Sequence, residues 1–217
     1  MTTKSPYTKF NRVDHVYSNV EFSEIVKDAV RFFAGTPVQP LPPAEKFHGT
    51  GVYLLYYVGK CPIYERFSEI NRLSHSLPIY VGKAVPKGWR QSRVSDGDDQ
   101  FSGELNSRLR EHAASINAVK ELNVEDFSCR FVIFEQESSD MISTVEAALI
   151  KIHVPLWNSI VDGFGNHDPG KGRYNQARSD WDVLHPGRKW SIKCKGHPNS
   201  MPEIEAKIKH YFNGYRA

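Results

Sequence analysis

The sequence predicts an α+β fold in which a small central antiparallel β-sheet is flanked by helices. Two observations lead to this class. Three short segments, 51–58, 78–82 and 129–135, are rich in the aromatic and β-branched residues of strands. Two longer segments, 102–121 and 140–153, carry apolar residues at helical spacing. The order strand, strand, helix, strand, helix is typical of a small sheet with helices packed against it.

An N-terminal arm over residues 1–47 precedes this core. Its segment 21–34 predicts a helix with one apolar face. That face consists of Phe22, Ile25, Val26, Ala29, Val30 and Phe33. Gly35 is a typical helix end. The four prolines between Pro37 and Pro43 exclude a helix interior or a central strand, so we expect an extended connector.

The core is expected over residues 48–160. Between its first two strands lies an insertion, about 60–78, that could hold a short helix or be irregular. A Gly-rich, basic extension over 161–217 follows, and its end predicts a helix over 202–212.

Composition excludes several classes of protein. No stretch approaches the roughly 18 apolar residues of a membrane span, and the N-terminus has no apolar signal region. Cys61, Cys129 and Cys194 are far apart and form no CxxC pair, which disfavours a zinc knuckle and a disulfide scaffold. We therefore expect a cytoplasmic protein. A net charge of +3 is too small to identify a nucleic-acid partner by itself.

Helix 102–121 places polar residues where apolar ones are expected. On a helical wheel, His112 falls inside the sector of Leu105, Leu109 and Ile116, and Arg108 lies at its edge. One interpretation is a buried core histidine beside an arginine whose aliphatic part packs at the edge of the apolar face. The other is a functional pair directed at the sheet.

Helix 140–153 has a similar anomaly. Glu146 projects from the middle of an apolar face that contains Val145 and Leu149. A buried carboxylate is costly unless it is paired or binds a cation, so the alternatives are a structural ion pair and a metal ligand.

Together, these side chains and the tyrosines of the two strands could form a phosphodiesterase site. An arginine would clamp phosphate, and a carboxylate would hold a divalent metal through hard oxygen. A tyrosine could position or deprotonate water, although its ordinary pKa of about 10 means that this role needs help from a metal or from His112.

The ordered set of motif residues resembles that of the GIY-YIG nucleases, over roughly residues 48–160. It consists of GVY at 51–53, YVG at 80–82, Arg108, His112, Glu146 and Asn158. The sequence departs from the family in the 26 residues between Tyr53 and Tyr80, where the family has a shorter connection.

The tripeptide YVG occurs twice, and the spacing decides which copy belongs to the motif. Tyr57-Val58-Gly59 follows Tyr53 on the same strand, so it cannot be the neighbouring strand. Tyr80-Val81-Gly82 can pair with that strand. We interpret Tyr56 and Tyr57 as residues that pack the sheet.

The pattern Arg-x-x-x-His at Arg108 and His112 resembles the type II restriction endonucleases of this family. The resemblance implies a homodimer that cuts double-stranded DNA at a palindrome, with CCGCGG as the best guess. It implies Mg²⁺, for which Mn²⁺ may substitute, as the cofactor. A two-fold symmetric protein matches a palindrome because each subunit then cuts one strand.

The resemblance also implies roles for the residues that handle protons. Tyr53 would be the general base toward water, and His112 would receive or relay its proton. Tyr80 would orient the nucleophile or the phosphate.

The remaining motif residues would hold charges and backbone in place. Arg108 would stabilise negative charge on the phosphate, Glu146 would bind the metal, and Asn158 would keep the site in register through hydrogen bonds.

A GC-rich target requires Arg or Lys side chains that donate to guanine. The candidates are Lys83, Lys87, Arg90, Arg93, Arg173, Arg178, Arg188 and Lys189. The sequence does not separate base contacts from phosphate contacts, and a charge run can also be plain solvated surface. The basic extension is expected to contact DNA, to form the dimer, or both.

Three other interpretations stay open or are set aside. The stretch 165–172 nearly fits a phosphate-binding loop, but Gly172 replaces the Ser or Thr that would bind magnesium. We therefore expect a flexible DNA-facing loop or a structural loop, and no nucleotide cofactor. The alternatives to a restriction enzyme are a structure-specific repair or homing nuclease, and a DNA-binding module without catalysis.

Overall fold

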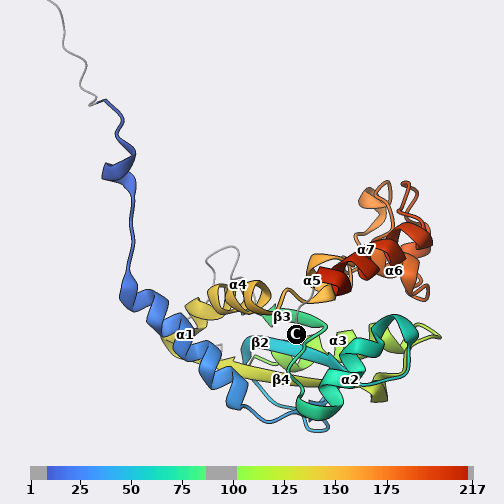
Figure 1. Cartoon of the computed structure of the whole chain (residues 1–217), viewed down its shortest axis with the longest axis horizontal. Helices are drawn as coiled ribbons and strands as arrows, with labels where there is room; N and C mark the ends of the chain where they lie inside the picture. The colour runs from blue at the N-terminus through green and yellow to red at the C-terminus, as the bar shows by residue number, and fades with distance from the viewer. Residues whose placement is uncertain (1–8, 87–101, 215–217) are drawn as a thin grey trace, which may run out of the picture.

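The computed structural model of the chain describes residues 9–86 and 102–214. Its centre is a four-stranded antiparallel sheet with strand order β1-β4-β2-β3 (Figure 1). The strands are β1 (Gln39–Pro40), β2 (Thr50–Tyr57), β3 (Tyr80–Ala84) and β4 (Phe127–Phe134). The predicted α+β class is confirmed, and the proline-rich connector supplies only the short edge strand β1, where a missing N–H is tolerated.

Strand β2 is central, and all eight of its residues are buried. Its side chains alternate between the two faces of the sheet, as the strand geometry requires. Tyr53, Leu55 and Tyr57 join one apolar core, whereas Leu54 and Tyr56 join the other. Tyr56 and Tyr57 are therefore packing residues, as the sequence predicted.

Helices cover both faces. The α-helices are α1 (Val20–Gly35), α2 (Glu65–Ser74), α3 (Glu104–Asn117), α4 (Ile142–His153), α5 (Leu156–Ser159), α6 (Asp180–Leu184) and α7 (Met201–Gly214). Short 3₁₀ turns are η1 (Arg12–His15), η2 (Pro62–Tyr64), η5 (Val124–Asp126), η6 (Gln136–Met141), η7 (Lys171–Arg173) and η8 (Ser191–Lys193). Helices α1 and α4 pack on one core, and the side chains of α2, α3 and α5 to α7 build the other.

The predicted elements differ from the observed ones mainly at their ends. Helix α3 stops at Asn117 rather than near 121, because the chain tightens into a turn in which the Val119 amide donates to the Ile116 carbonyl. The insertion between the GVY and YVG strands contains η2 and the two-to-three-turn helix α2. Asn71 of α2 hydrogen-bonds the backbone of Tyr57 and Leu77, which holds the insertion against the sheet.

The N-terminal arm is only partly packed. Phe33 of α1 is buried and Val30 is partly buried, but Phe22 and Ile25 on the same predicted face are half exposed. Figure 1 shows the reason, because the arm and the start of α1 run away from the body of the molecule. Only the end of the apolar face that the sequence predicted therefore packs against the core.

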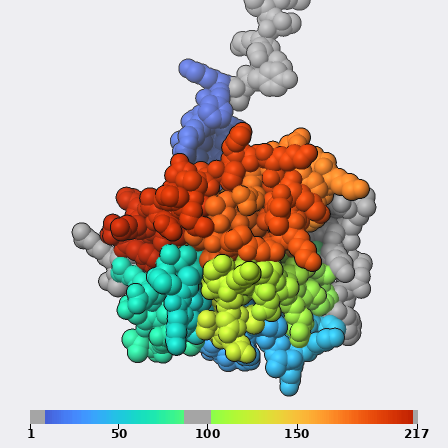
Figure 2. Space-filling view, turned by 90° about the vertical axis from the view of Figure 1, so that its right-hand side faces the viewer, coloured from blue at the N-terminus to red at the C-terminus, as the bar shows by residue number. Residues whose placement is uncertain are grey.

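The C-terminal segment 161–214 packs on the core instead of trailing from it. Trp157 of α5 contacts Trp181 of α6 with ring centroids 5.8 Å apart, and Ile204 and Ile208 of α7 are buried in the same core. Figure 2 shows this segment, in orange and red, lying across α2 and the yellow-green part of the chain. Within the described ranges, no helix is long and apolar enough to cross a membrane.

Candidate active site

The centre of the candidate site is a hydrogen bond between strand β2 and helix α3. The Tyr53 hydroxyl lies 2.6 Å from Nε2 of His112, and both side chains are buried. His112 occupies an apolar position of α3, so the helix that packs on the sheet necessarily presents the imidazole to the strand. The histidine that looked misplaced in the sequence is thus a direct partner of Tyr53.

Strand β3 brings the second tyrosine beside the first. Gly82 pairs with Tyr53 across the ladder, and Tyr80 lies two residues earlier on the same side of β3. The ring centroids of Tyr53 and Tyr80 are 6.3 Å apart. A Cβ at position 82 would overlap the Tyr53 hydroxyl, so the last residue of the YVG motif has to be glycine.

Asn158 fixes strand β3 from the start of the C-terminal segment. Its side-chain oxygen accepts a hydrogen bond from the Val81 amide, and its side-chain nitrogen donates to the Val81 carbonyl, both at 2.8 Å. The amide side chain therefore acts as one more strand at the exposed sheet edge. It ties helix α5 (Leu156–Ser159) to the residue that follows Tyr80.

Arg108 lies one helical turn before His112 on α3, at the rim of the site. Its Nη1 donates to Oε2 of Glu111 at 2.9 Å and also contacts Nε2 of His167. Its Nη2 donates to the Gly165 carbonyl at 2.7 Å. Two of these three partners come from the C-terminal segment.

Glu146 approaches from the opposite face of the sheet. Helix α4 packs beside β3, and the Glu146 Oε2 lies 2.7 Å from Nζ of Lys83 on that strand. Both side chains are partly exposed, at 19% for Glu146 and 34% for Lys83. The sequence predicted Lys83 as a DNA contact, whereas in the structure it pairs with the carboxylate of the site.

These residues surround one pocket of about 370 Å³ at the edge of the sheet. Its lining residues are Tyr53, Tyr80, Lys83, Ala84, Val85, Glu104, Ser107, Arg108, Glu111, Glu146 and His167. The pocket therefore brings together the two tyrosines, the arginine and the carboxylate that the sequence predicted, with His112 directly behind Tyr53.

Burial controls the protonation of the central pair. Burial, followed by the nearby Tyr80, raises the pKa of Tyr53 well above its usual value. Burial, followed by the charge of Arg108, lowers the pKa of His112 well below its usual value. His112 is therefore a neutral imidazole, and its Nε2 can accept the proton of the Tyr53 hydroxyl.

The loop after α5 forms part of the wall of the site, which the sequence did not reveal. Phe164 stacks on His112 with ring centroids 4.5 Å apart and planes at 17°, and its ring lies 5.0 Å from that of Tyr80. Gly165 and His167 contact Arg108. The stretch was interpreted as a flexible or structural loop, and the only local signal was the dense run of glycine and aromatic residues at 163–165.

The structure spreads the predicted DNA contacts over different environments. Lys87, Arg90 and Arg93 lie outside the described residues. Arg173 and Lys189 are exposed, and Arg178 is partly exposed.

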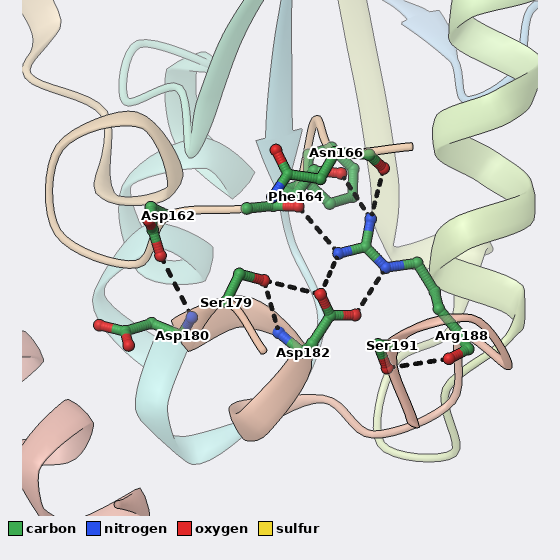
Figure 3. Close-up of polar contacts among 9 residues, drawn as sticks. Asp162, Phe164, Asn166, Ser179, Asp180, Asp182, Arg188 and Ser191 are labelled. Atoms are coloured by element: carbon green, nitrogen blue, oxygen red, sulfur yellow. Dashed lines mark hydrogen bonds and ion pairs between the residues drawn. The ribbon is translucent and has the colours of Figure 1, made fainter. Parts of the chain in front are cut away.

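Arg188 is different, because only 5% of it is exposed. Its Nε and Nη2 each donate a hydrogen bond of 2.8 Å to the carboxylate of Asp182 (Figure 3). Its other N–H groups donate to the carbonyls of Gly163, Phe164 and Asn166. All five N–H donors of the Arg188 guanidinium are thus used inside the protein. No donor is left for DNA, so this geometry argues against the predicted DNA contact at Arg188.

The donor set of the pocket fits a hard divalent cation. Glu146 supplies a carboxylate oxygen. The positively charged ammonium of Lys83 lies next to this oxygen, where a cation would bind. Among the residues the structure describes, no group of three or more His, Cys, Asp and Glu side chains could hold a metal ion. A divalent cation does not require such a group, because Mg²⁺ can bind through one or two carboxylates together with water and substrate phosphates.

Comparison with known protein families matches residues 45–212 to the Eco29kI GIY-YIG domain, a family of type II restriction endonucleases. The match covers strands β2, β3 and β4 with the motif residues, and the C-terminal segment that carries the loop beside the pocket. No curated protein sequence matches the chain.

Proposed function

The chain belongs to the Eco29kI GIY-YIG family of restriction endonucleases, and on this premise we propose that it is a type II enzyme that cuts double-stranded DNA at one short palindrome. CCGCGG is our best guess for the target. The observation that carries the proposal is the buried Tyr53–His112 hydrogen bond at a pocket that also contains Arg108 and Glu146. A non-catalytic module would have no need to keep this combination.

In the proposed reaction, the proton path starts at a water molecule in the pocket. The Tyr53 hydroxyl donates to Nε2 of neutral His112, which leaves the lone pairs of the oxygen available for the water. As the water attacks phosphorus, Tyr53 accepts its proton and passes its own to His112. The bond from phosphorus to one sugar oxygen breaks at the same time, and this leaving oxygen takes a proton from solvent. In this relay Tyr53 does not have to exist as a free tyrosinate, because its own proton leaves for His112 as the proton of the water arrives.

Arg108 and Tyr80 would organise the phosphate. Arg108 is held by Glu111, Gly165 and His167 before any substrate arrives, so its charge needs little reorganisation during the reaction. Tyr80 lines the same pocket and would orient the water or a phosphate oxygen. Asn158 would keep Tyr80 in place through the backbone of Val81.

Glu146 would hold the cofactor, Mg²⁺ or Mn²⁺, with water and DNA oxygens as the other ligands. A bound divalent cation there would supply Lewis-acid polarisation of the phosphate and neutralise developing charge. Lys83 would then release the carboxylate and turn toward DNA, so its predicted role as a DNA contact remains part of the proposal.

The exposed arm supports the proposal of a homodimer. Phe22 and Ile25 are half exposed, and Phe10 and Tyr17 before them are 75% and 85% exposed. Contiguous apolar surface on a soluble chain commonly marks an interface, and two symmetric subunits suit a palindrome. We expect Phe22→Glu combined with Ile25→Glu to convert a dimer into a monomer in sedimentation velocity, and a variant that keeps the dimer would contradict this role of the arm.

DNA contacts beyond the pocket are proposed for Arg173, Arg178 and Lys189, and for the three predicted residues outside the described ranges. Arg173 and Lys189 are exposed. Replacing a phosphate contact should weaken binding to all sequences and reduce its salt dependence, whereas replacing a base contact should relax the target sequence.

The test is cleavage of a random-sequence duplex library with Mg²⁺, followed by sequencing of the new ends. Ends that converge on one palindrome, with no cutting in EDTA, are the expected result. Tyr53→Phe should abolish cutting, and Tyr56→Phe on the opposite face of the same strand is the matched control. Scattered ends, or cutting of branched DNA only, would favour a repair or homing nuclease, and tight binding without cutting would favour a non-catalytic module.

A further inference from the structure

The loop Gly163–His167 contacts the catalytic arginine from the C-terminal side. We propose, building on the nuclease function above, that His167 is a positioning residue of the active site. Together with the Gly165 carbonyl, it holds the guanidinium of Arg108 toward the pocket. The buried Arg188–Asp182 ion pair holds the loop that carries both.

The contacts at Arg108 are the first argument. An arginine side chain on a helix surface has many rotamers, and fixing them costs free energy unless partners define the orientation. Here Nη2 donates to the Gly165 carbonyl at 2.7 Å, and Nη1 is shared between Glu111 and His167. The helix supplies one of these partners, Glu111, and the loop supplies the other two, while Tyr53 and Tyr80 also interact with the guanidinium. The loop therefore helps to fix the direction in which the planar fork faces.

The contact with Arg108 determines which ring nitrogen of His167 carries the proton. A guanidinium has only donors, so Nε2 of His167 must offer its lone pair and the ring proton must lie on Nδ1. Nδ1 lies 3.9 Å from Oε2 of Glu111. Partial burial, Arg108 and Arg188 lower the pKa of His167, and Glu111 opposes them. The neutral ring that the contact requires is therefore the state expected at neutral pH.

The anchoring of the loop is the second argument. Arg188 donates to the carbonyls of Gly163, Phe164 and Asn166, which precede His167 by one to four residues (Figure 3). The carboxylate of Asp182 completes the cluster and also accepts from the Ser179 hydroxyl at 2.7 Å. Because this cluster is buried, the backbone next to His167 is fixed to a rigid support.

The loop sequence is also adapted to the site. A Cβ at position 165 would come within 2.5 Å of the Tyr80 hydroxyl, so only glycine allows the carbonyl of residue 165 to reach Arg108. Phe164 stacks on His112. The side chain of His167, in contrast, is 65% exposed and contributes little to the core. Its position is thus better explained by the contact with Arg108 than by packing.

The first experiment compares single-turnover cleavage by wild type, His167→Ala, His167→Gln and the control His210→Ala, an exposed histidine on α7. We expect His167→Ala to cut about tenfold more slowly, with unchanged melting temperature and unchanged DNA affinity measured without metal. Glutamine offers a carbonyl acceptor in place of Nε2 and should restore most of the rate. Equal rates for wild type and His167→Ala, or equal losses for Ala and Gln, would overturn the proposal.

The pH profile gives a readout that a purely structural role would not change. The titratable and charged groups that face His167 are Arg108, Glu111 and His112 on α3, and Arg188 in the C-terminal segment. Protonation of His167 would place a second cation against Arg108 and break the contact as the pH falls. The acid limb of the wild-type rate should therefore lie at higher pH than that of His167→Gln, and superimposable limbs would contradict the assignment.

A second measurement does not depend on cleavage. The ring nitrogens of His167 are titrated by ¹⁵N NMR in the free full-length protein, in wild type and in Arg108→Met. Loss of the arginine should raise the pKa of His167, and an unchanged value would show that the contact is absent. A wild-type protein that binds DNA without cutting it would overturn the proposed nuclease site, and this measurement would still decide whether His167 holds Arg108.

Discussion

Two arginines, Arg108 and Arg188, bind the same loop, and they differ in what surrounds them. Arg188 is buried and donates to three loop carbonyls and to the buried carboxylate of Asp182. Arg108 donates to a single loop carbonyl and to Glu111, whose side chain is 53% exposed, and its guanidinium lines the pocket.

The comparison separates a structural arginine from one that is prepared for a substrate. When protein groups use every donor, as at Arg188, the side chain stabilises the fold and offers nothing to DNA. When partners fix the orientation but the group remains at the edge of a pocket, as at Arg108, the charge stays available. Each prediction below tests this difference, from the largest expected effect to the smallest.

The largest effect is expected at Arg108. Arg108→Ala should lower the cleavage rate by about 10⁴-fold, because an arginine that stabilises charge on a transferring phosphate is worth about 10³ to 10⁵ in rate. The melting temperature should change little, since the side chain lies at the rim. Arg110→Ala, on the same helix, is the matched control, and a similar loss in both variants would remove the special role of Arg108.

Arg188 should show the opposite pattern. Arg188→Ala leaves the carboxylate of Asp182 buried without its cation, so the free energy of unfolding should fall by about 3–5 kcal/mol. Urea denaturation measures this fall. Lys189→Ala, an exposed neighbour, should stay within about 0.5 kcal/mol of wild type. An Arg188→Ala protein of normal stability that binds DNA weakly would restore the expectation of a DNA contact.

Each arginine region also contains a buried neutral histidine, which makes stability depend on pH. Burial lowers the pKa of His112 well below 6.5 and that of His185 to about 3. The unfolded chain binds protons at these residues below about pH 6.5 whereas the folded chain does not, so stability is lost as the pH falls. Between pH 7.5 and 5.5 the two should together cost roughly 2–3 kcal/mol.

The measurement is urea denaturation at both pH values. His185→Gln keeps a polar partner for Tyr64, whose hydroxyl lies 2.6 Å from Nε2, and should remove about half of the pH dependence. A stability that is flat over this range would show that these histidines are not buried as neutral rings.

The smallest effect tests whether the two arginines are linked through the loop. Arg188→Lys keeps a positive charge but loses the planar guanidinium that donates to three loop carbonyls. We therefore expect about a tenfold lower cleavage rate, measured at a temperature where the variant is folded. Combined with His167→Ala, the loss should be much less than the product of the two, because both changes release the same contact. Fully multiplicative losses would mean that Arg188 acts by another route.

The sequence predicted the parts of the molecule that follow local periodicity. Strand alternation and helical spacing located β2, β3, β4 and the main helices. The same spacing identified His112 and Glu146, since a polar residue on an apolar face can be recognised within a few turns. The separation of Tyr53 from Tyr57 and Tyr80 was enough to choose the correct YVG copy, because strand pairing sets a minimum length for the connection.

The remaining parts depend on contacts between distant segments. Arg188 and Lys189 are neighbours in one basic run, and only the position of Asp182 and of three carbonyls about 22 to 25 residues earlier makes one buried and the other exposed. His167 is 59 residues from Arg108. The spacing of residues within one segment does not indicate contacts between residues so far apart in the sequence. The contribution of this loop to the site could therefore not be predicted.

The dependence of the site on the C-terminal ion pair has a consequence for the order in which the chain is made. During translation, all six motif residues have left the ribosome once residue 158 has emerged from it. Asp182 and Arg188 are synthesised only later. Until then, the hydrogen bonds from Arg188 to the loop carbonyls cannot form, and we expect a growing chain to be inactive. For an enzyme that cuts DNA, activity would thus begin only after Arg188 has been synthesised and has paired with Asp182. Translation products that stop before this point would leave DNA intact.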